Sequence, residues 1–141
     1  MKKFTILLVP IIFVLTTITS CSSGSEENEM TPSYVGQYFY YRNVAKVNGT
    51  VTTDENHENN SCSSKSNYTI KSDNSVISET YSSSNFGGPC NSVYTANYTY
   101  DTTSQTIDGQ KVSFEANNLI LSQINTFGTT TTENIFYYKR K

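Results

Sequence analysis

The 141-residue sequence contains no tryptophan and few charged residues, which make up 16% of the chain against roughly 25% in typical globular proteins. It also lacks an excess of basic residues. Without residues 1–20, which include Lys2 and Lys3, eight basic and twelve acidic side chains remain, a net charge of −4. Phosphate groups and anionic lipid repel such a surface. The composition therefore argues against nucleic-acid binding and against electrostatic attachment to a membrane.

Motifs for catalysis and metal binding are also lacking. No Gly-x-Ser-x-Gly nucleophile motif appears. The only histidine, His57, lies in the polar stretch 54–58, without the second histidine or the i, i+4 spacing of a zinc site. Its neighbouring carboxylates could bind a metal ion weakly, but a solvated loop is the simpler interpretation. We therefore expect no enzyme activity, no metal ion and no cofactor.

The first twenty residues have the organisation of a lipoprotein signal peptide. Lys2 and Lys3 precede an uncharged stretch, Phe4 to Ile18, which is shorter than the roughly 20 residues needed to span a bilayer. The following Ile18-Thr19-Ser20-Cys21 resembles a lipobox, the site read by lipoprotein signal peptidase. We expect cleavage before Cys21, lipidation of that cysteine, and attachment to a membrane through the lipid. The alternative is an ordinary secretory signal that happens to end beside a cysteine.

The three cysteines support this interpretation, because acylation of Cys21 accounts for the odd thiol of an exported chain. Cys62 and Cys90 then remain as a predicted disulfide, the alternative being two reduced, unrelated thiols. Residues 21–33 are predicted to be a flexible tether. Its acidic cluster (Glu26, Glu27 and Glu29) resembles the export signal that sends some lipoproteins of Bacteroidetes to the outer face of the outer membrane. We expect an outer-membrane lipoprotein on the periplasmic or cell-surface face; the alternative for the cluster is a solvated linker.

Residues 34–141 are predicted to form one all-β domain. β-branched threonine and the eleven tyrosines favour strands, and no stretch has a helical period of useful length. Asn48-Gly49 and Asp108-Gly109 are typical of tight hairpin turns. The predicted strands are 35–47, 50–54, 68–71, 76–81, 93–100, 105–107, 111–114, 119–124 and 134–138. Eight or nine short strands favour an antiparallel sandwich or barrel, and closing the sheet should remove exposed edges.

The order of short motifs in this domain resembles the small lipocalin-like lipoproteins of Bacteroidetes. The motifs are Gly36-Gln37-Tyr38, Asn48-Gly49, Cys62, Cys90 and the tail Phe136-Tyr137-Tyr138-Lys139-Arg140. The resemblance implies a small up-and-down barrel of about eight strands. It also implies that Tyr38 packs under Arg140 beside Gly36 and closes the narrow end of the barrel. Tyrosine replaces the usual tryptophan, and the resemblance implies no particular ligand.

Five tyrosines are the candidate ligand-binding residues: Tyr38, Tyr40, Tyr94, Tyr98 and Tyr100. They could line the barrel interior, with hydroxyls that orient a small apolar or amphipathic ligand. They could equally fill a core that lacks tryptophan. The first hypothesis is therefore a membrane-anchored ligand-binding barrel. The alternative is a filled barrel that acts as an interaction module and contacts an envelope protein or a glycan.

One possible modification site stands apart from the tyrosines. Asp101-Thr102-Thr103 resembles the tripeptide at which this bacterial group O-glycosylates exported proteins, with Thr102 as the acceptor. The alternative is a plain turn.

Overall fold

The computed structural model describes residues 32–59, 62–83 and 88–141. The predicted signal peptide, Cys21 and almost all of the acidic tether lie outside the described residues. Within the described ranges no helix is long and apolar enough to cross a membrane.

In these described ranges, nine strands and one short 3-10 helix form the domain, and a strand is present at each of the nine predicted places. The elements are β1 (Gly36–Val47), β2 (Thr50–Asn56), η1 (Ser63–Lys65), β3 (Asn67–Ile70), β4 (Ser75–Ser82), β5 (Ser92–Asp101), β6 (Thr106–Ile107), β7 (Gln110–Glu115), β8 (Asn118–Phe127) and β9 (Thr130–Arg140). The predicted turns at Asn48-Gly49 and Asp108-Gly109 are confirmed, since all four residues have the positive φ of a type I′ turn.

The strands β8 and β9 are longer than predicted. Phe127 pairs with Thr130 across a two-residue turn that contains Gly128, whose φ is 59°. The sequence prediction ended β8 at Ile124, because threonine and asparagine on either side of Gly128 were not recognised as strand residues. The two strands thus form one long hairpin.

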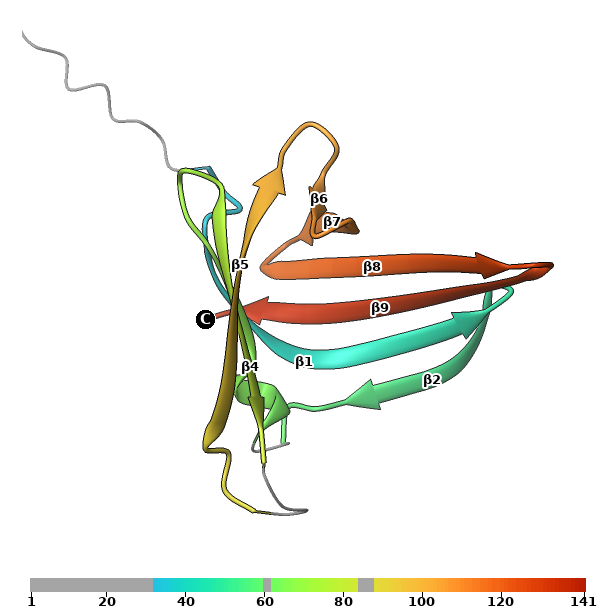
Figure 1. The fold of residues 1–141 in the computed structure, drawn as a ribbon, viewed down its shortest axis with the longest axis horizontal. Helices are drawn as coiled ribbons and strands as arrows, with labels where there is room; N and C mark the ends of the chain where they lie inside the picture. The colour runs from blue at the N-terminus through green and yellow to red at the C-terminus, as the bar shows by residue number, and fades with distance from the viewer. Residues whose placement is uncertain (1–31, 60–61, 84–87) are drawn as a thin grey trace, which may run out of the picture.

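The sheet is antiparallel throughout and follows the order β2-β1-β3-β4-β5-β6-β7-β8-β9, with β9 returning to pair with β1. The predicted fold class is therefore confirmed, because an up-and-down antiparallel sheet closes into a barrel-like ring (Figure 1). The closing pair β1–β9 is in register from Tyr38↔Arg140 to Val47↔Thr132, with one irregularity between Tyr40 and Arg42.

Two strands share one edge of β1. The strand β3 pairs with Gly36–Phe39, and β2 pairs further along with Arg42–Val47. Between them the chain leaves the edge after His57, whose N–H donates to the carbonyl of Tyr41 at 2.6 Å, and returns at Ser66, whose carbonyl accepts from the N–H of Tyr40 at 2.9 Å. The strands β2 and β3 therefore act as one interrupted strand, with η1 in the excursion.

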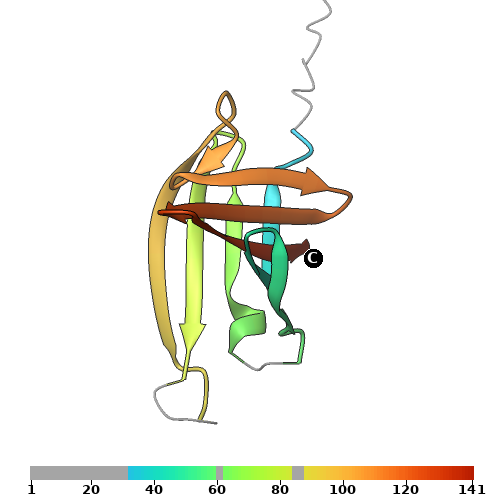
Figure 2. The ribbon, with the colours of Figure 1, turned by 90° about the vertical axis from the view of Figure 1, so that its right-hand side faces the viewer.

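Parts of the strands β1, β2, β8 and β9 project sideways from the ring (Figures 1 and 2). We call this part the blade; it consists of residues 42–47, 50–56, 123–127 and 130–135 of the neighbouring strands β1, β2, β8 and β9. Asn48 joins its two hairpin tips, because its N–H donates to the carbonyl of Thr131 and its Oδ1 accepts from the N–H of Thr131, both at 2.8 Å. The blade is thus a fixed part of the fold.

The blade corrects one prediction about sheet edges. Among the described residues, β2 pairs only with β1, and β7 pairs with β8 only as far as Ser122. The outer edges of β2 and of residues 123–127 are therefore open, although the sheet closes. Ring closure protects the strands around the core and leaves the longer hairpins beyond it unprotected.

The hydrophobic core fills the interior of the ring. Its buried members are Tyr38, Ile70, Val76, Tyr100, Ile107, Val112, Leu119 and Leu121. They come from β1 and from β3 to β8 through the alternation of inward and outward side chains. Tyr34, Tyr68, Tyr98, Phe114, Phe136 and Tyr138 pack against them. Aromatic rings thus supply much of a core that has no tryptophan.

The predicted disulfide is confirmed. Cys62, just before η1, is bonded to Cys90, just before β5, with a Cα–Cα distance of 5.2 Å. The bond ties the excursion between β2 and β3 to the loop that connects β4 with β5.

Candidate functional site

The five candidate tyrosines do not form one cavity. Tyr38 and Tyr100 belong to the buried core, and Tyr98 packs against it. Tyr40 lies further along β1, with its ring 5.4 Å from that of Tyr138. Tyr94 is 71% exposed near the start of β5. Strand alternation places Tyr94 on the same face of β5 as Tyr98 and Tyr100. Tyr94 nevertheless lies beyond the end of the core and does not line the interior.

The end of the ring that contains Tyr38 is closed. Tyr38 is paired with Arg140, whose guanidinium lies 5.9 Å from the centre of the tyrosine ring. Arg140 donates to the carbonyl of Ser33 at 3.0 Å and to the carbonyl of Val35. A Cβ on Gly36 would lie 2.7 Å from Nε of Arg140, so glycine provides the space for the guanidinium. The three residues named by the lipocalin resemblance are therefore in contact.

Tyr34 completes the closed end, and the sequence analysis gave it no role. Its ring packs edge-on against Tyr100, with centroids 5.1 Å apart, and lies 5.8 Å from the ring of Phe114. Its hydroxyl donates to Oδ1 of Asn74 at 2.7 Å, and its carbonyl accepts from the hydroxyl of Tyr38 at 2.8 Å. Burial raises the pKa of Tyr38, with Arg140 opposing that shift. This end is a packed plug of aromatic rings.

The opposite end has a pocket of about 220 Å³ at the mouth of the ring. It is lined by Tyr40, Ser63, Ser66, Thr80, Tyr81, Phe136 and Tyr138. The ring of Tyr138 lies edge-on to that of Tyr68 at 5.1 Å, and burial raises the pKa of Tyr138 well above its usual range, so its hydroxyl stays neutral. Aromatic carbons and neutral hydroxyls together suit an amphipathic molecule. Phe136 and Tyr138 belong to the aromatic tail of the sequence and lie two residues apart, which places them on the same face of β9.

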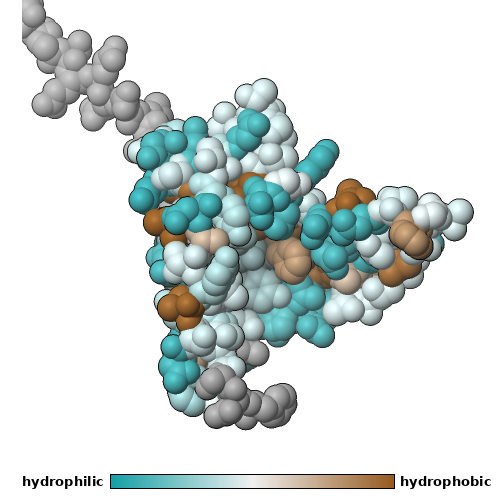
Figure 3. All heavy atoms as spheres, viewed as in Figure 1, coloured by the Kyte–Doolittle hydropathy of each residue, from teal (hydrophilic) through white to brown (hydrophobic). Residues whose placement is uncertain are grey.

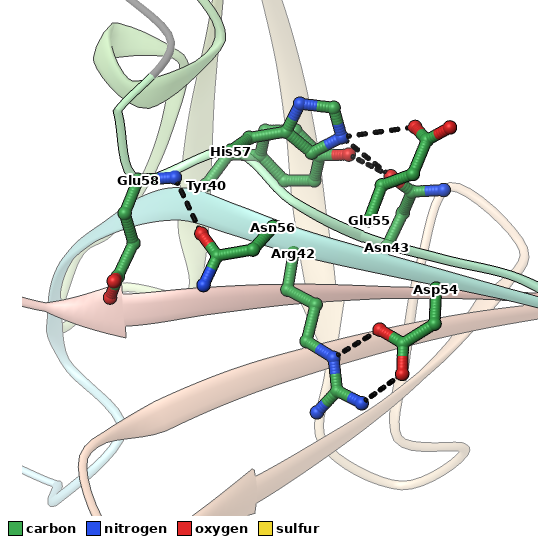
Figure 4. Close-up of polar contacts among 8 residues, drawn as sticks. All are labelled: Tyr40, Arg42, Asn43, Asp54, Glu55, Asn56, His57 and Glu58. Carbon is green, nitrogen blue, oxygen red and sulfur yellow. Dashed lines mark hydrogen bonds and ion pairs between the residues drawn. The ribbon is translucent and has the colours of Figure 1, made fainter.

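The rim of this mouth carries a polar cluster around His57 (Figure 4). Oδ1 of Asn43 accepts from the hydroxyl of Tyr40 at 3.0 Å and is 2.7 Å from Nε2 of His57. The imidazole stacks on the ring of Tyr40, with centroids 5.1 Å apart, and its Nε2 is 3.4 Å from a carboxylate oxygen of Glu55. Burial, followed by the charge of Glu55, raises the pKa of Tyr40. His57 directly follows β2 and lies in a loop as predicted, but its side chain is half-buried and not solvated.

The His57 cluster offers few metal ligands. In the described ranges no three side chains of histidine, cysteine, aspartate or glutamate are grouped so that they could hold a metal ion. On the outer side of the sheet, Arg42 binds Asp54 through two hydrogen bonds of 2.8 and 2.7 Å, which lower the pKa of that carboxyl. The polar contacts at the rim thus orient side chains around Tyr40.

A second hollow region lies on the outer face of the ring. One hollow of about 330 Å³ is lined by Phe39, Tyr40, Tyr41, Glu58, Ser64, Lys139, Arg140 and Lys141. An adjoining one of about 420 Å³ is lined by Gln37, Phe39, Ser64, Lys65, Asn67, Glu79, Tyr81 and Lys141. The two hollows share Phe39, which lies under the ammonium group of Lys141 at 4.2 Å. This open groove mixes aromatic rings with charges of both signs.

Thr102 is exposed in the turn between β5 and β6. Asp101 organises that turn, because its Oδ1 accepts from the N–H groups of Thr103 at 2.8 Å and Ser104 at 3.1 Å. Hydrogen bonds from these two residues lower the pKa of Asp101. The hydroxyl of Thr102 is therefore presented on a well-defined turn, which fits both the glycosylation hypothesis and a plain turn.

The lipocalin resemblance depended on short motifs, and the structure adds geometry at two of them. Tyr38 contacts Arg140, and Cys62 is bonded to Cys90. These contacts describe how the ring closes and how the excursion is held. Comparison of the chain with protein-family models, with curated protein sequences and with solved structures finds no match.

Proposed function

We propose that the chain is a lipoprotein, anchored to the outer membrane through Cys21, whose barrel binds a small amphipathic molecule at its open mouth. The signal-peptide pattern and the lipobox-like Ile18-Thr19-Ser20-Cys21 support the anchor. The absence of a recognisable catalytic motif in the sequence favours binding over catalysis. The observation that carries the binding role is the pocket lined by Tyr40, Phe136 and Tyr138.

The size of the pocket restricts the ligand. Its volume of about 220 Å³ is below the roughly 300–1,000 Å³ of pockets that hold drug-sized molecules. The core below it is packed with buried side chains. The ligand is therefore a small molecule, or the end of a longer one whose remainder stays outside the mouth.

The described chain begins at the closed end of the ring, opposite the mouth. Ser33 and Tyr34, where the described chain begins, contact Arg140 and Tyr100 at the closed end. The eleven residues 21–31 can span at most roughly 36–40 Å when extended. A lipid on Cys21 would therefore attach the domain through its closed end and leave the mouth clear of the attachment point.

Binding of the fluorescent amphiphile N-phenyl-1-naphthylamine tests the pocket. The mature chain with Cys21→Ser avoids the proposed lipid and the detergent it requires. In that background Thr80→Trp fills the mouth and Tyr40→Ala removes one wall; both should abolish the fluorescence increase. Tyr94→Ala, a matched tyrosine that is exposed outside the pocket, should retain it. An equal signal in all variants, or none in the parent, would contradict the proposed site.

The outer groove favours a second candidate, an interaction module that contacts a glycan or an envelope protein. Phe39 and Tyr41 offer flat apolar surfaces beside Lys139, Lys141 and Glu58. Aromatic residues are enriched in the centre of protein interfaces, and polar residues surround them at the rim. Phe39→Ala should weaken binding to a glycan array under this candidate and leave the binding of N-phenyl-1-naphthylamine unchanged, which separates the two functions.

A further inference from the structure

The outer edge of β8 in the blade is one of two open edges of the sheet among the described residues. Residues 123–127 pair with β9 on one side, and no described strand pairs with them on the other. In an antiparallel ladder about half of the residues direct their N–H and C=O groups to each side. The edge therefore presents a row of backbone groups that can pair with another strand.

This edge carries no charge. The stretch 116–132, between Glu115 and Glu133, contains no charged residue. The other open edge of the blade, β2, contains Asp54 and Glu55. Charged side chains at an edge discourage pairing between copies of a protein. The edge of β2 is guarded in this way, and the edge of β8 is not.

The same edge also exposes apolar side chains. Phe127 is 92% exposed and Ile124 is 58% exposed, and their positions along the strand place them on opposite faces of the blade. In the space-filling view, hydrophobic atoms lie among weakly polar ones on the projecting part of the molecule (Figure 3). The neighbouring charges of the blade, Lys46 and Glu133, are paired at 3.0 Å. The surroundings of the β8 edge thus favour association.

A bilayer would not satisfy this edge, because lipid offers no partners for open backbone groups. Another β-strand would satisfy them. A second copy suits the edge in particular, since an uncharged strand that meets itself has no like-charge repulsion. We propose that residues 123–127 pair antiparallel with the same residues of a second copy and join two blades into one continuous sheet. This proposal does not depend on the ligand pocket.

A symmetric register follows from the sequence of the edge. With Asn125 on the two-fold axis, Gln123 of one copy lies opposite Phe127 of the other, and Ile124 lies opposite Thr126. The ring of Phe127 then covers the aliphatic part of Gln123 on one face, and Ile124 packs against the methyl group of Thr126 on the other. Cross-strand pairs of this kind stabilise antiparallel sheets.

Cross-linking of the full chain in the membranes of cells that express it tests the register. In the Asn125→Cys variant the two new thiols face each other across the axis, within reach of a disulfide. Mild oxidation should convert most of the protein to a species of twice the monomer mass on a non-reducing gel. Thr52→Cys, a matched exposed position on the edge of β2, should stay monomeric.

Any other outcome of this cross-linking experiment would overturn the proposal. Equal cross-linking of both variants would indicate random collision, no product from Asn125→Cys would exclude the register, and a product of another mass would identify a different partner. Adding Ile124→Lys to Asn125→Cys should abolish the dimer by placing charge on the edge, while the monomer keeps its melting temperature. A dimer that persists in this double variant would also refute edge pairing.

Discussion

The disulfide between Cys62 and Cys90 offers a sharp test of how this small domain is stabilised. We expect the double variant Cys62→Ser, Cys90→Ser to fold into the same ring with much lower stability. Replacing both cysteines avoids a leftover free thiol. Both replacements are made in the Cys21→Ser background, which avoids the proposed lipid, and the Cys21→Ser parent, which keeps the bond, is the matched control.

The expected loss follows from the length of chain that the bond closes. The two cysteines are 28 residues apart in the sequence. The chain-entropy model gives roughly 3–4 kcal/mol for a loop of this length at 25 °C. Small domains have total stabilities of roughly 5–15 kcal/mol. For a domain of about 100 residues such a loss lowers the melting temperature by roughly 15–25 °C.

The disulfide should also affect ligand binding at the mouth pocket. Cys62 directly precedes η1, and the neighbouring Ser63 and Ser66 line the mouth pocket. Without the bond to Cys90 this wall is held only by its remaining contacts. The double variant should therefore bind N-phenyl-1-naphthylamine more weakly than the Cys21→Ser control at a temperature where both are folded.

Urea unfolding followed by circular dichroism measures the main effect. The midpoint should be lower in the double variant than in the Cys21→Ser control, with an equal or larger slope, since the unfolded chain is less restrained without the bond. A loss below about 1 kcal/mol would refute the entropic reasoning. A smaller slope would instead indicate that the native state of the double variant had lost compactness.

Three further predictions concern the closed end, the tyrosines and the anchor. Arg140→Ala removes the guanidinium contacts to Ser33 and Val35 and should cost about 1–3 kcal/mol in urea unfolding; an unchanged midpoint would mean that these contacts do not stabilise the end. Burial raises the pKa of Tyr138 above the ordinary 10.0, so the stabilisation by its neutral form is complete below pH 10 and is lost as the pH rises further. Tyrosinate absorbance should then show a group that ionises only on unfolding, and Tyr138→Phe should lessen the alkaline loss of stability; ionisation of all tyrosines in the folded state near pH 10 would contradict this. Cys21→Ala should abolish incorporation of radiolabelled fatty acid, and persistent label would refute the lipoprotein hypothesis.

Local signals in the sequence were enough to predict most of the strands. Asn48-Gly49 and Asp108-Gly109 fix tight turns through residues that tolerate a positive φ, and strand alternation identified the buried faces. The contact of Tyr38 with Arg140 joins residues from the beginning and the end of the domain's sequence. No local pattern predicts such a contact, and only the family resemblance suggested it.

Features that depend on position along the ring could not be predicted in this way. Alternation gives the face of Tyr94 but not its distance from the core, so its exposure was missed. His57 is polar by sequence context, yet the return of the chain to β1 stacks it on Tyr40. Tyr34 lies before the first strand, and its role as a plug depends on contacts with Tyr100 and Phe114.

The interruption between β2 and β3 has a consequence for how the mouth can diversify. Both segments use the same edge of β1, so the hydrogen bonds of the ring do not depend on what the chain does between them. Residues added between His57 and Cys62 would reshape the surroundings of the pocket and spare both the disulfide and the closing pair β1–β9. The excursion is therefore a natural insertion point, where foreign peptides could be grafted and new binding properties selected on an unchanged scaffold.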